Sequence, residues 1–389
     1  MTVDRCEPSS ASAQEVAEAV RSGATTAAEV AEATMEVIAE KDQKVCAFVA
    51  LWPETAQRCA AGVDQSVAEG VHLPLAGVPI AVKASEGVDS WQTQRLIEAG
   101  CVPVGATSVP AKGTQWRTWG YTDRGPTRNP YFLDRSPGGS SAGSAVAVAM
   151  GMVPLATGSD GAGSVRLPAA WCGVLGLKPT NGRVPARDRA GLNVAGPLSR
   201  CAVDAAHYLD AIAGTDVADD LGPPIKTPRV LWSADLGFAR TDDSVASTAF
   251  GALGELIGQK VVQHVTGTVE LWDPAGAWKA LRSAQGNDTK DLVAEVCAYN
   301  DAHLADLFTR TDVIATPTTP NPPHGHNGPG ETISVALTWA FNLSGHPAIS
   351  LPAGLTHKGE PVGLQLVARA GDERLLLGLA HHRDEWLGQ

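Results

Sequence analysis

Two loops rich in glycine and serine carry residues suited to nucleophilic chemistry. Ser140 lies in the first loop and Ser164 in the second, 24 residues later. A serine attacks a carbonyl carbon only when a base removes its proton, and the carbonyl oxygen then gains negative charge that backbone N–H groups can stabilise. Glycines next to a serine let several N–H groups converge on one point. We therefore expect the second loop to form an oxyanion hole from four consecutive residues: Gly161, Ala162, Gly163 and Ser164.

The required base is the second element of such a site. All ten histidines lie outside the segment between His72 and His207, which contains both loops, so a histidine could reach them only through the tertiary fold. Lys83 is the alternative, because it ends an apolar run over 78–82 that is typical of a buried strand. Burial lowers the pKa of a lysine from about 10.4, since the ammonium form is disfavoured away from water. A buried Lys83 is therefore a candidate base.

Taken together, these motifs resemble the amidase signature family. The resemblance is carried by GVPIAVK ending at Lys83, by GGSS at 138–141, and by GAGSVRLPAAWCGVLGLKPTNGRV at 161–184. Members of that family hydrolyse amides with a Ser–cis-Ser–Lys triad. The resemblance implies that Ser164 is the nucleophile, that Ser140 is the bridging serine in a cis peptide and relays the proton, and that Lys83 is the base.

Neighbouring residues are expected to support this triad. Ser141 and Asp160 are interpreted as hydrogen-bond partners that hold the two loops. Arg166 resembles an arginine near the active-site loop of the family, and a structural ion pair explains it equally well. Three tryptophans are candidates for the wall of an acyl pocket, although packing in the core is the favoured explanation: Trp116, Trp119 and Trp171.

The elements that must position these residues indicate an α/β protein. Helices are predicted over 13–21, 26–41 and 54–69, with a strand over 45–51 between the last two. The resemblance implies one large mixed sheet covered on both faces by helices. We expect a single amidase domain over 1–389, divided into an N-terminal helical flank (1–70), a catalytic core (71–204), a variable middle (205–310) and C-terminal strands with a helix (311–389).

Two segments depart from the family pattern and suggest a short member of the family. The loop after Lys83, over 84–90, lacks the acidic residue after the lysine and the longer glycine-rich stretch of relatives. The middle of the chain is also short, and nothing in it indicates a ligand. The pattern leaves the substrate open among fatty, aryl and short amides, carbamates and acyl-protected amines.

Composition excludes several kinds of partner. The 389 residues carry a formal net charge of −12, which argues against a nucleic-acid partner. Seven scattered cysteines without a C-x-x-C pair indicate reduced thiols rather than disulfides or zinc, and the start of the chain lacks a signal-peptide pattern. We expect a cytoplasmic enzyme with a small-molecule amide substrate, no cofactor, no metal and no membrane partner. A metal site at His324 and His326 is the less favoured interpretation of that segment, and a homodimer is left open.

Three alternatives remain at this stage. GSSAG at 139–143 matches the nucleophile elbow of α/β-hydrolases, with Ser141 as nucleophile, but no hydrophobic strand precedes it. A glutaminase component of an amidotransferase would use the same triad and a partner protein. A non-catalytic binding protein on the same fold is the third, and it would be marked by a broken triad.

Overall fold

The computed structural model describes residues 11–111, 119–186, 188, 190–222, 226–283 and 290–387. The strands in this part are β1 (Phe48–Leu51), β2 (Pro79–Lys83), β3 (Val102–Thr107), β4 (Tyr121–Thr122), β5 (Gly125–Pro126), β6 (Leu155–Asp160), β7 (Leu175–Lys178), β8 (Val194–Ser199), β9 (Arg229–Trp232), β10 (Gln263–Val265), β11 (Val313–Pro317), β12 (Ala348–Leu355) and β13 (Pro361–Ala368). Eleven of these strands form one mixed sheet in the order β1-β3-β2-β6-β8-β7-β12-β13-β11-β9-β10, and β4 pairs with β5.

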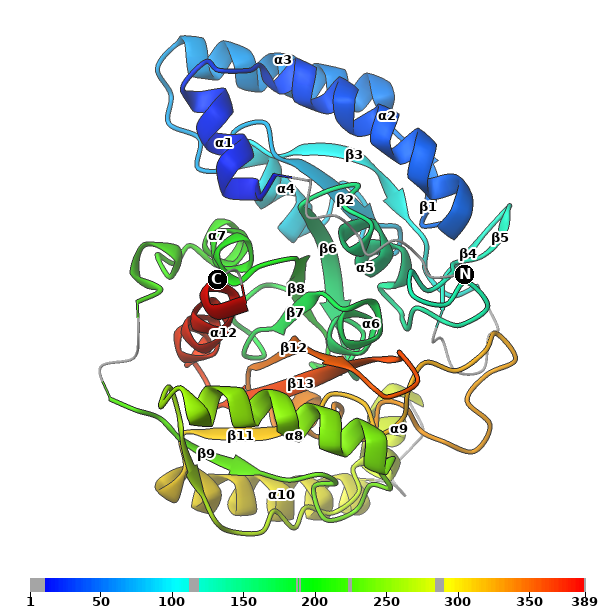
Figure 1. Cartoon of the computed structure of the whole chain (residues 1–389), viewed down its shortest axis with the longest axis vertical. Coiled ribbons are helices and arrows are strands. Elements are labelled where there is room, and N and C mark those ends of the chain that lie inside the picture. The colour runs from blue at the N-terminus through cyan, green and yellow to red at the C-terminus, as the bar shows by residue number, and fades with distance from the viewer. Residues whose placement is uncertain are drawn as a thin grey trace.

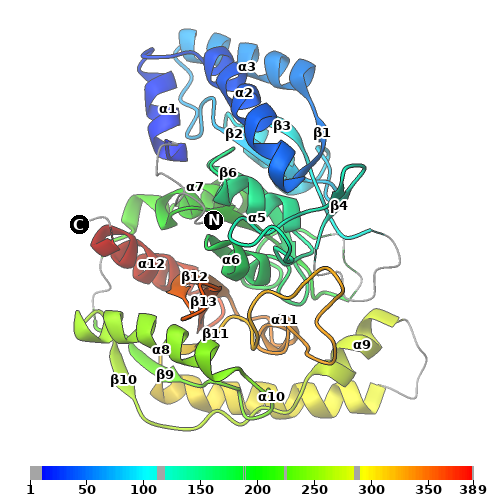
Figure 2. The same cartoon turned by 45° about the vertical axis from the view of Figure 1, so that its right-hand side comes forward.

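Helices cover both faces of this sheet (Figure 1). They are α1 (Ala13–Arg21), α2 (Ala27–Val45), α3 (Pro53–Ala68), α4 (Trp91–Glu98), α5 (Ala142–Ala149), α6 (Arg166–Cys172), α7 (Ala202–Ala213), α8 (Asp243–Gly258), α9 (Ala275–Ser283), α10 (Lys290–Arg310), α11 (Ala340–Leu343) and α12 (Glu373–Leu387), with a 3₁₀ turn at Ala218–Asp220. α1–α3 lie at one end of the molecule and α8–α10 at the other (Figures 1 and 2). The predicted α/β class with one large mixed sheet is confirmed.

Alternation along β2 determines where its terminal lysine points. Ile80 and Val82 pack in a cluster with residues of α4 and α7, whereas Ala81 packs in a cluster with residues of α2, α3 and α5. Successive side chains of a strand point to opposite faces. Lys83 therefore lies on the same face as Ala81, which is the face that α5 and the preceding serine loop cover.

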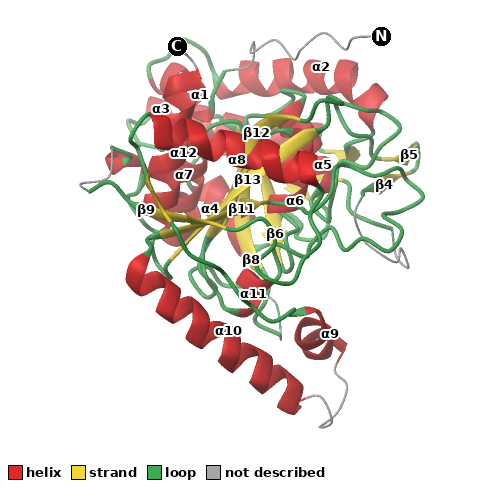
Figure 3. Cartoon of the chain, turned by 60° about the horizontal axis from the view of Figure 1, so that its bottom comes forward, coloured by secondary structure: helices red, strands yellow, loops and turns green. Residues whose placement is uncertain are grey.

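The same alternation along β11 shows that helices cover both faces of the other half of the sheet as well. Val313 and Ala315 pack with residues of α8 and α12, whereas Ile314 packs with residues of α10 and α11. The sequence of a strand that is buried on both faces is a nearly continuous run of apolar residues. Figure 3 shows the strands between layers of helix, with α9 and α10 together at one edge.

Two predicted boundaries near the start of the chain differ in the structure. The strand expected over 45–51 begins at Phe48, because α2 continues to Val45 and Cys46 then adopts a left-handed backbone with φ of 54°. α8 begins after Asp242, whose carboxylate accepts the N–H groups of Ser244 and Val245. The C-terminal part of the chain supplies β11, β12 and β13, with α11 between β11 and β12.

None of the helices that the structure describes combines the length and the apolar character needed to cross a membrane.

Candidate active site

Lys83 ends β2 in the interior of the sheet, between the parallel strands β3 and β6. Its side chain is only 2% exposed. Burial lowers the pKa of Lys83 to about 8, and the negative charges of Glu86 and Asp160 oppose this effect without cancelling it. A lysine in this position can lose its proton near neutral pH, as a base must.

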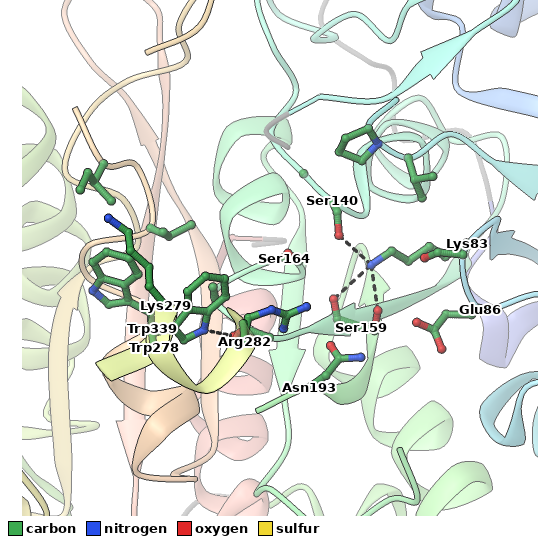
Figure 4. A pocket seen from close by; sticks show the side chains of 18 of the residues that line it. Lys83, Glu86, Ser140, Ser159, Ser164, Asn193, Trp278, Lys279, Arg282 and Trp339 are labelled. Atoms are coloured by element: carbon green, nitrogen blue, oxygen red, sulfur yellow. Dashed lines mark hydrogen bonds between the residues drawn. The ribbon is translucent and has the colours of Figure 1, made fainter. Parts of the chain in front are cut away.

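The amine of Lys83 contacts two serines (Figure 4). Its Nζ lies 3.0 Å from Ser140 Oγ, 2.8 Å from Ser159 Oγ and 3.2 Å from the carbonyl oxygen of Ser159. The backbone N–H of Lys83 donates to Thr157 Oγ1 at 2.8 Å. Strand β6 therefore holds both the backbone N–H and the side-chain amine of Lys83, and it directs this amine to the loop that carries Ser140.

The loop that carries Ser140 is held against α6. The Gly139–Ser140 peptide bond is cis, and Gly138 has a φ of 83°. A Cβ atom on Gly138 would lie 2.4 Å from Leu167 Cδ2, so only glycine fits there. The N–H of Ser141 donates to the carbonyl oxygen of Ser164 at 3.2 Å, which joins the two serine loops.

Ser141 contributes to the site through its backbone rather than through its hydroxyl. Its Oγ is buried and has no hydrogen-bond partner in the described part of the chain, so the N–H of Ser141 makes the bond that joins the loops. Ser141 also follows a loop, since the last strand before it is β5, and it lies at the start of α5. The interpretation of Ser141 as an α/β-hydrolase nucleophile is therefore wrong, because an elbow serine sits between a strand and a helix.

Asp160 holds the loop of Ser164, as predicted from its position. Its carboxylate accepts the N–H groups of Gly163 at 2.7 Å and of Val165 at 3.2 Å, together with two hydrogen bonds from the Arg166 guanidinium at 2.8 and 3.0 Å. Burial acts to raise the pKa of Asp160, but the pairing with Arg166 and a hydrogen bond from Asn342 hold it well below its usual range. The structural ion pair is thus the arrangement that Arg166 adopts, with both side chains fully buried.

The predicted oxyanion donors are not equivalent. The N–H of Gly163 is already donated to Asp160, which removes it from the predicted set. Trp278 Nε1 donates to the carbonyl oxygen of Gly161 at 2.7 Å, and this bond fixes the peptide plane that carries the N–H of Ala162. The predicted set of oxyanion donors is thereby reduced to the N–H groups of Gly161, Ala162 and Ser164.

A cavity of about 880 Å³ opens over these residues. Lys83, the three serines Ser140, Ser159 and Ser164, and the nearby Glu86 and Asn193 form the polar part of its lining. An apolar wall is formed by Val109, Pro110, Ile333 and Val335. The rest of the lining comes from Trp278, Lys279, Arg282 and Trp339. All three residues of the expected triad therefore border one space that could hold a small amide.

The tryptophans of this cavity are not those considered from the sequence. Trp171 is fully buried and its indole N–H contacts Thr319 and Asn321, and neither it nor Trp119 borders the cavity. Trp116 lies outside the described residues. Trp278 and Trp339 line the cavity instead, with ring centroids 6.2 Å apart.

The histidines considered for a metal site have other contacts. The ring of His324 lies 5.2 Å from that of Trp171, and His326 Nε2 lies 3.0 Å from the carbonyl oxygen of Thr127. Among the described residues, no group of three or more histidine, cysteine, aspartate or glutamate side chains is arranged to hold a metal ion.

Comparison with known proteins identifies the family. A family model described as Amidase matches residues 84–237 and 282–377, which together exceed half of the chain. This chain is a member of the amidase signature family. Membership makes it a hydrolase of amide C–N bonds, and it confirms the resemblance seen in the sequence.

Three relatives of this amidase are informative. The acylamidase of Rhodococcus erythropolis is 33% identical over 453 residues, which cover 95% of this chain and 94% of that protein. A glutamyl-tRNA(Gln) amidotransferase subunit from Carboxydothermus hydrogenoformans is 31% identical, covering 95% and 96%. The solved structure of 6-aminohexanoate cyclic dimer hydrolase superposes with a TM-score of 0.80 at 26% identity, covering 100% and 98%.

This amidase is short, as the sequence indicated. The alignment with the acylamidase spans 453 residues, more than the 389 of this chain, so the relative has segments without a counterpart here. The family model leaves out 238–281, yet α9 brings Trp278 and Lys279 from that segment to the cavity. The sequence of the middle indicated no ligand, and the structure adds that one face of α9 borders the cavity.

Ser159 is a further residue that the sequence interpretation missed. A signal for it was present, since Thr157 and Ser159 are two positions apart on a buried strand and therefore share a face. Both hydroxyls contact Lys83 on the neighbouring strand. A pair of hydroxyl residues with this spacing, next to a strand that ends in lysine, indicates a polar lining for the amine.

Proposed function

We propose that this protein hydrolyses a small-molecule carboxylic amide through an acyl-enzyme on Ser164, with Lys83 as base and Ser140 as proton relay. The observation that carries the proposal is the buried Lys83 amine, 3.0 Å from Ser140 Oγ and in the same cavity as Ser164. β2, which ends in Lys83, pairs with β6, which leads into the loop of Ser164, so the chain is proposed to act as a single catalytic unit.

In the first half-reaction, neutral Lys83 takes the proton of Ser140 as Ser140 takes that of Ser164. The Ser164 oxygen then bonds to the amide carbon, and the carbonyl oxygen becomes an oxyanion that the free backbone N–H groups of the loop stabilise. The proton returns from Lys83 through Ser140 to the amide nitrogen, so that the C–N bond breaks and a neutral amine leaves.

In the second half-reaction, water replaces the amine. Lys83 accepts a proton from this water, again through Ser140, and the hydroxide attacks the ester carbon of the acyl-enzyme. Collapse of the second oxyanion breaks the bond to Ser164, whose oxygen recovers its proton, and the carboxylic acid leaves. The lysine therefore ends each turnover in the neutral form in which it began.

The test is a comparison of Ser164→Ala with Ser247→Ala, an exposed serine of α8 outside the cavity. Ser164→Ala is expected to lose amide hydrolysis across a panel of fatty, aryl, short, cyclic and carbamate substrates. It is also expected to lose the covalent adduct that a fluorophosphonate forms on the native chain, as read by peptide mass spectrometry. Normal turnover by Ser164→Ala, or an adduct that maps to another residue, would refute the assignment.

A glutaminase component of an amidotransferase is the second candidate, because such a protein is among the relatives. The purified chain distinguishes the two, since a freestanding amidase hydrolyses its substrate alone. Turnover of glutamine that requires a co-purified partner, with none of the panel hydrolysed by the chain alone, would favour the glutaminase.

A further inference from the structure

Four charged side chains border the cavity, and they are divided between two sides. Lys83 and Glu86 lie on one side, and Lys279 and Arg282 of α9 lie on the other (Figure 4). No carboxylate within the described residues forms an ion pair with Lys279 or Arg282. The α9 side of the cavity therefore presents two cations that no described carboxylate pairs with.

Arg282 is fixed at the nucleophile loop although it is exposed to solvent. Trp278 donates its indole N–H to the carbonyl oxygen of Gly161 at 2.7 Å and so anchors α9 to the loop. Arg282 follows one turn later on the same helix face, and its guanidinium carbon lies 5.0 Å from the centroid of the Trp278 ring. A Cβ atom on Gly161 would lie only 3.0 Å from Arg282 Nη1, which shows how closely the cation approaches the loop.

Asn193 lies next to the same point. Its Oδ1 would be 3.4 Å from a Cβ atom on Gly161, and its side chain borders the cavity. A planar guanidinium with a neighbouring amide is well suited to a carboxylate, because both offer N–H donors and the guanidinium adds charge. Lys279 adds a second positive charge on the same side.

We propose that Arg282, assisted by Lys279, selects amide substrates that carry a carboxylate close to the scissile bond. The proposal rests on the function proposed for Ser164. Gly161 precedes Ser164 by three residues, which span at most about 10 Å of chain, so the carboxylate lies a few bonds from the attacked carbonyl. Glu86 on the opposite side repels a carboxylate and disfavours the reversed orientation.

The carboxylate belongs either to the acyl part or to the leaving amine, and matched substrates separate the two. Succinamic acid is compared with butyramide, and N-acetyl-β-alanine with N-propylacetamide. We expect the native chain to prefer one of the two charged substrates by about tenfold or more in kcat/KM, the scale of a charge-assisted hydrogen bond reduced by solvent exposure. The preference should also weaken as ionic strength rises.

The decisive variant is Arg282→Gln, with Arg240→Gln as its control because Arg240 is exposed and lies outside the cavity. Arg282→Gln should raise KM for the preferred charged substrate about tenfold and leave the neutral amides unchanged, whereas Arg240→Gln should change neither. Equal kcat/KM of the native chain on charged and neutral partners, or an equal effect of Arg282→Gln on both, would overturn the proposal.

A labelling experiment keeps this test separate from that of the proposed function. Succinate or β-alanine should slow fluorophosphonate labelling of Ser164 in the native chain and in Arg240→Gln, but not in Arg282→Gln. Labelling that neither carboxylate slows would refute the carboxylate site while the serine mechanism stands. Absence of any label on Ser164 would instead refute the serine mechanism and, with it, the selection of its substrate.

Discussion

Raising the pH from 8 to 10 should increase kcat/KM only about twofold. Burial lowers the pKa of Lys83 to about 8, so about half of the enzyme already has the neutral amine at pH 8. A lysine with its ordinary pKa of about 10.4 would gain neutral amine by more than fiftyfold over the same interval. Between pH 6 and 8 the rate should rise about fiftyfold, because one proton is lost with a midpoint near 8.

The assay is kcat/KM on a substrate that does not titrate between pH 6 and 10, since this quantity reports the free enzyme. Samples held at pH 9.5 and returned to pH 8 control for inactivation. A rate that continues to climb tenfold per pH unit above 9 would show that Lys83 is not a buried base. A plateau reached below pH 7 would equally refute the reasoning.

Glu86→Gln tests the same titration of Lys83 by removing a charge that raises its pKa. The negative charge of Glu86 raises the pKa of Lys83, so its removal should move the midpoint of the profile to lower pH. Glu36→Gln, at an exposed position of α2 outside the cavity, should leave the midpoint unchanged. A midpoint that moves to higher pH in Glu86→Gln would contradict the electrostatic argument.

Three further changes follow from contacts near the site. Asp160→Asn leaves the guanidinium of Arg166 buried without its partner and should lower the free energy of unfolding in urea by about 3–5 kcal/mol. Ser159→Ala should lower kcat about tenfold to a hundredfold by releasing the Lys83 amine, and Ser159→Thr should restore it at unchanged stability. Gly143→Ala places a methyl group 2.1 Å from a backbone oxygen and should destabilise the fold by about 1–3 kcal/mol in thermal unfolding, whereas Gly251→Ala in open space should not.

The serine loops and the lysine could be located from the sequence because local patterns mark each of them. An apolar run ending in lysine gives a buried strand end, and glycine next to serine gives a loop with converging N–H groups. The structure adds that Lys83 and Ser140 are in contact and that Ser164 borders the same cavity. Lys83, Ser140 and Ser164 come together through the local geometry of their loops and through one strand pairing, that of β2 with β6.

The residues that form the far side of the cavity could not be found in this way. α9 carries Trp278 and Arg282 on a short helix whose contacts with the nucleophile loop join residues more than a hundred positions apart. Periodicity indicates which side of a helix is apolar, but it does not indicate which loop the helix meets. Trp171 lies close to the loop in sequence and was a candidate for the pocket wall, but the fold places its ring in the core, as the favoured interpretation had it.

Arg166 resolves a conflict in the electrostatics of the site. The ionised Asp160 accepts N–H groups of the loop that carries Ser164, yet its negative charge raises the pKa of Lys83. Two hydrogen bonds from Arg166 make the aspartate part of a neutral pair, whose field falls off faster with distance than that of a single charge. Burial then determines the pKa of Lys83, and the amine can be neutral near pH 8 while the loop stays fixed. We therefore expect the ion pair that holds the loop of Ser164 also to limit the negative charge that Lys83 experiences, which makes the structural and the active-site interpretations of Arg166 compatible.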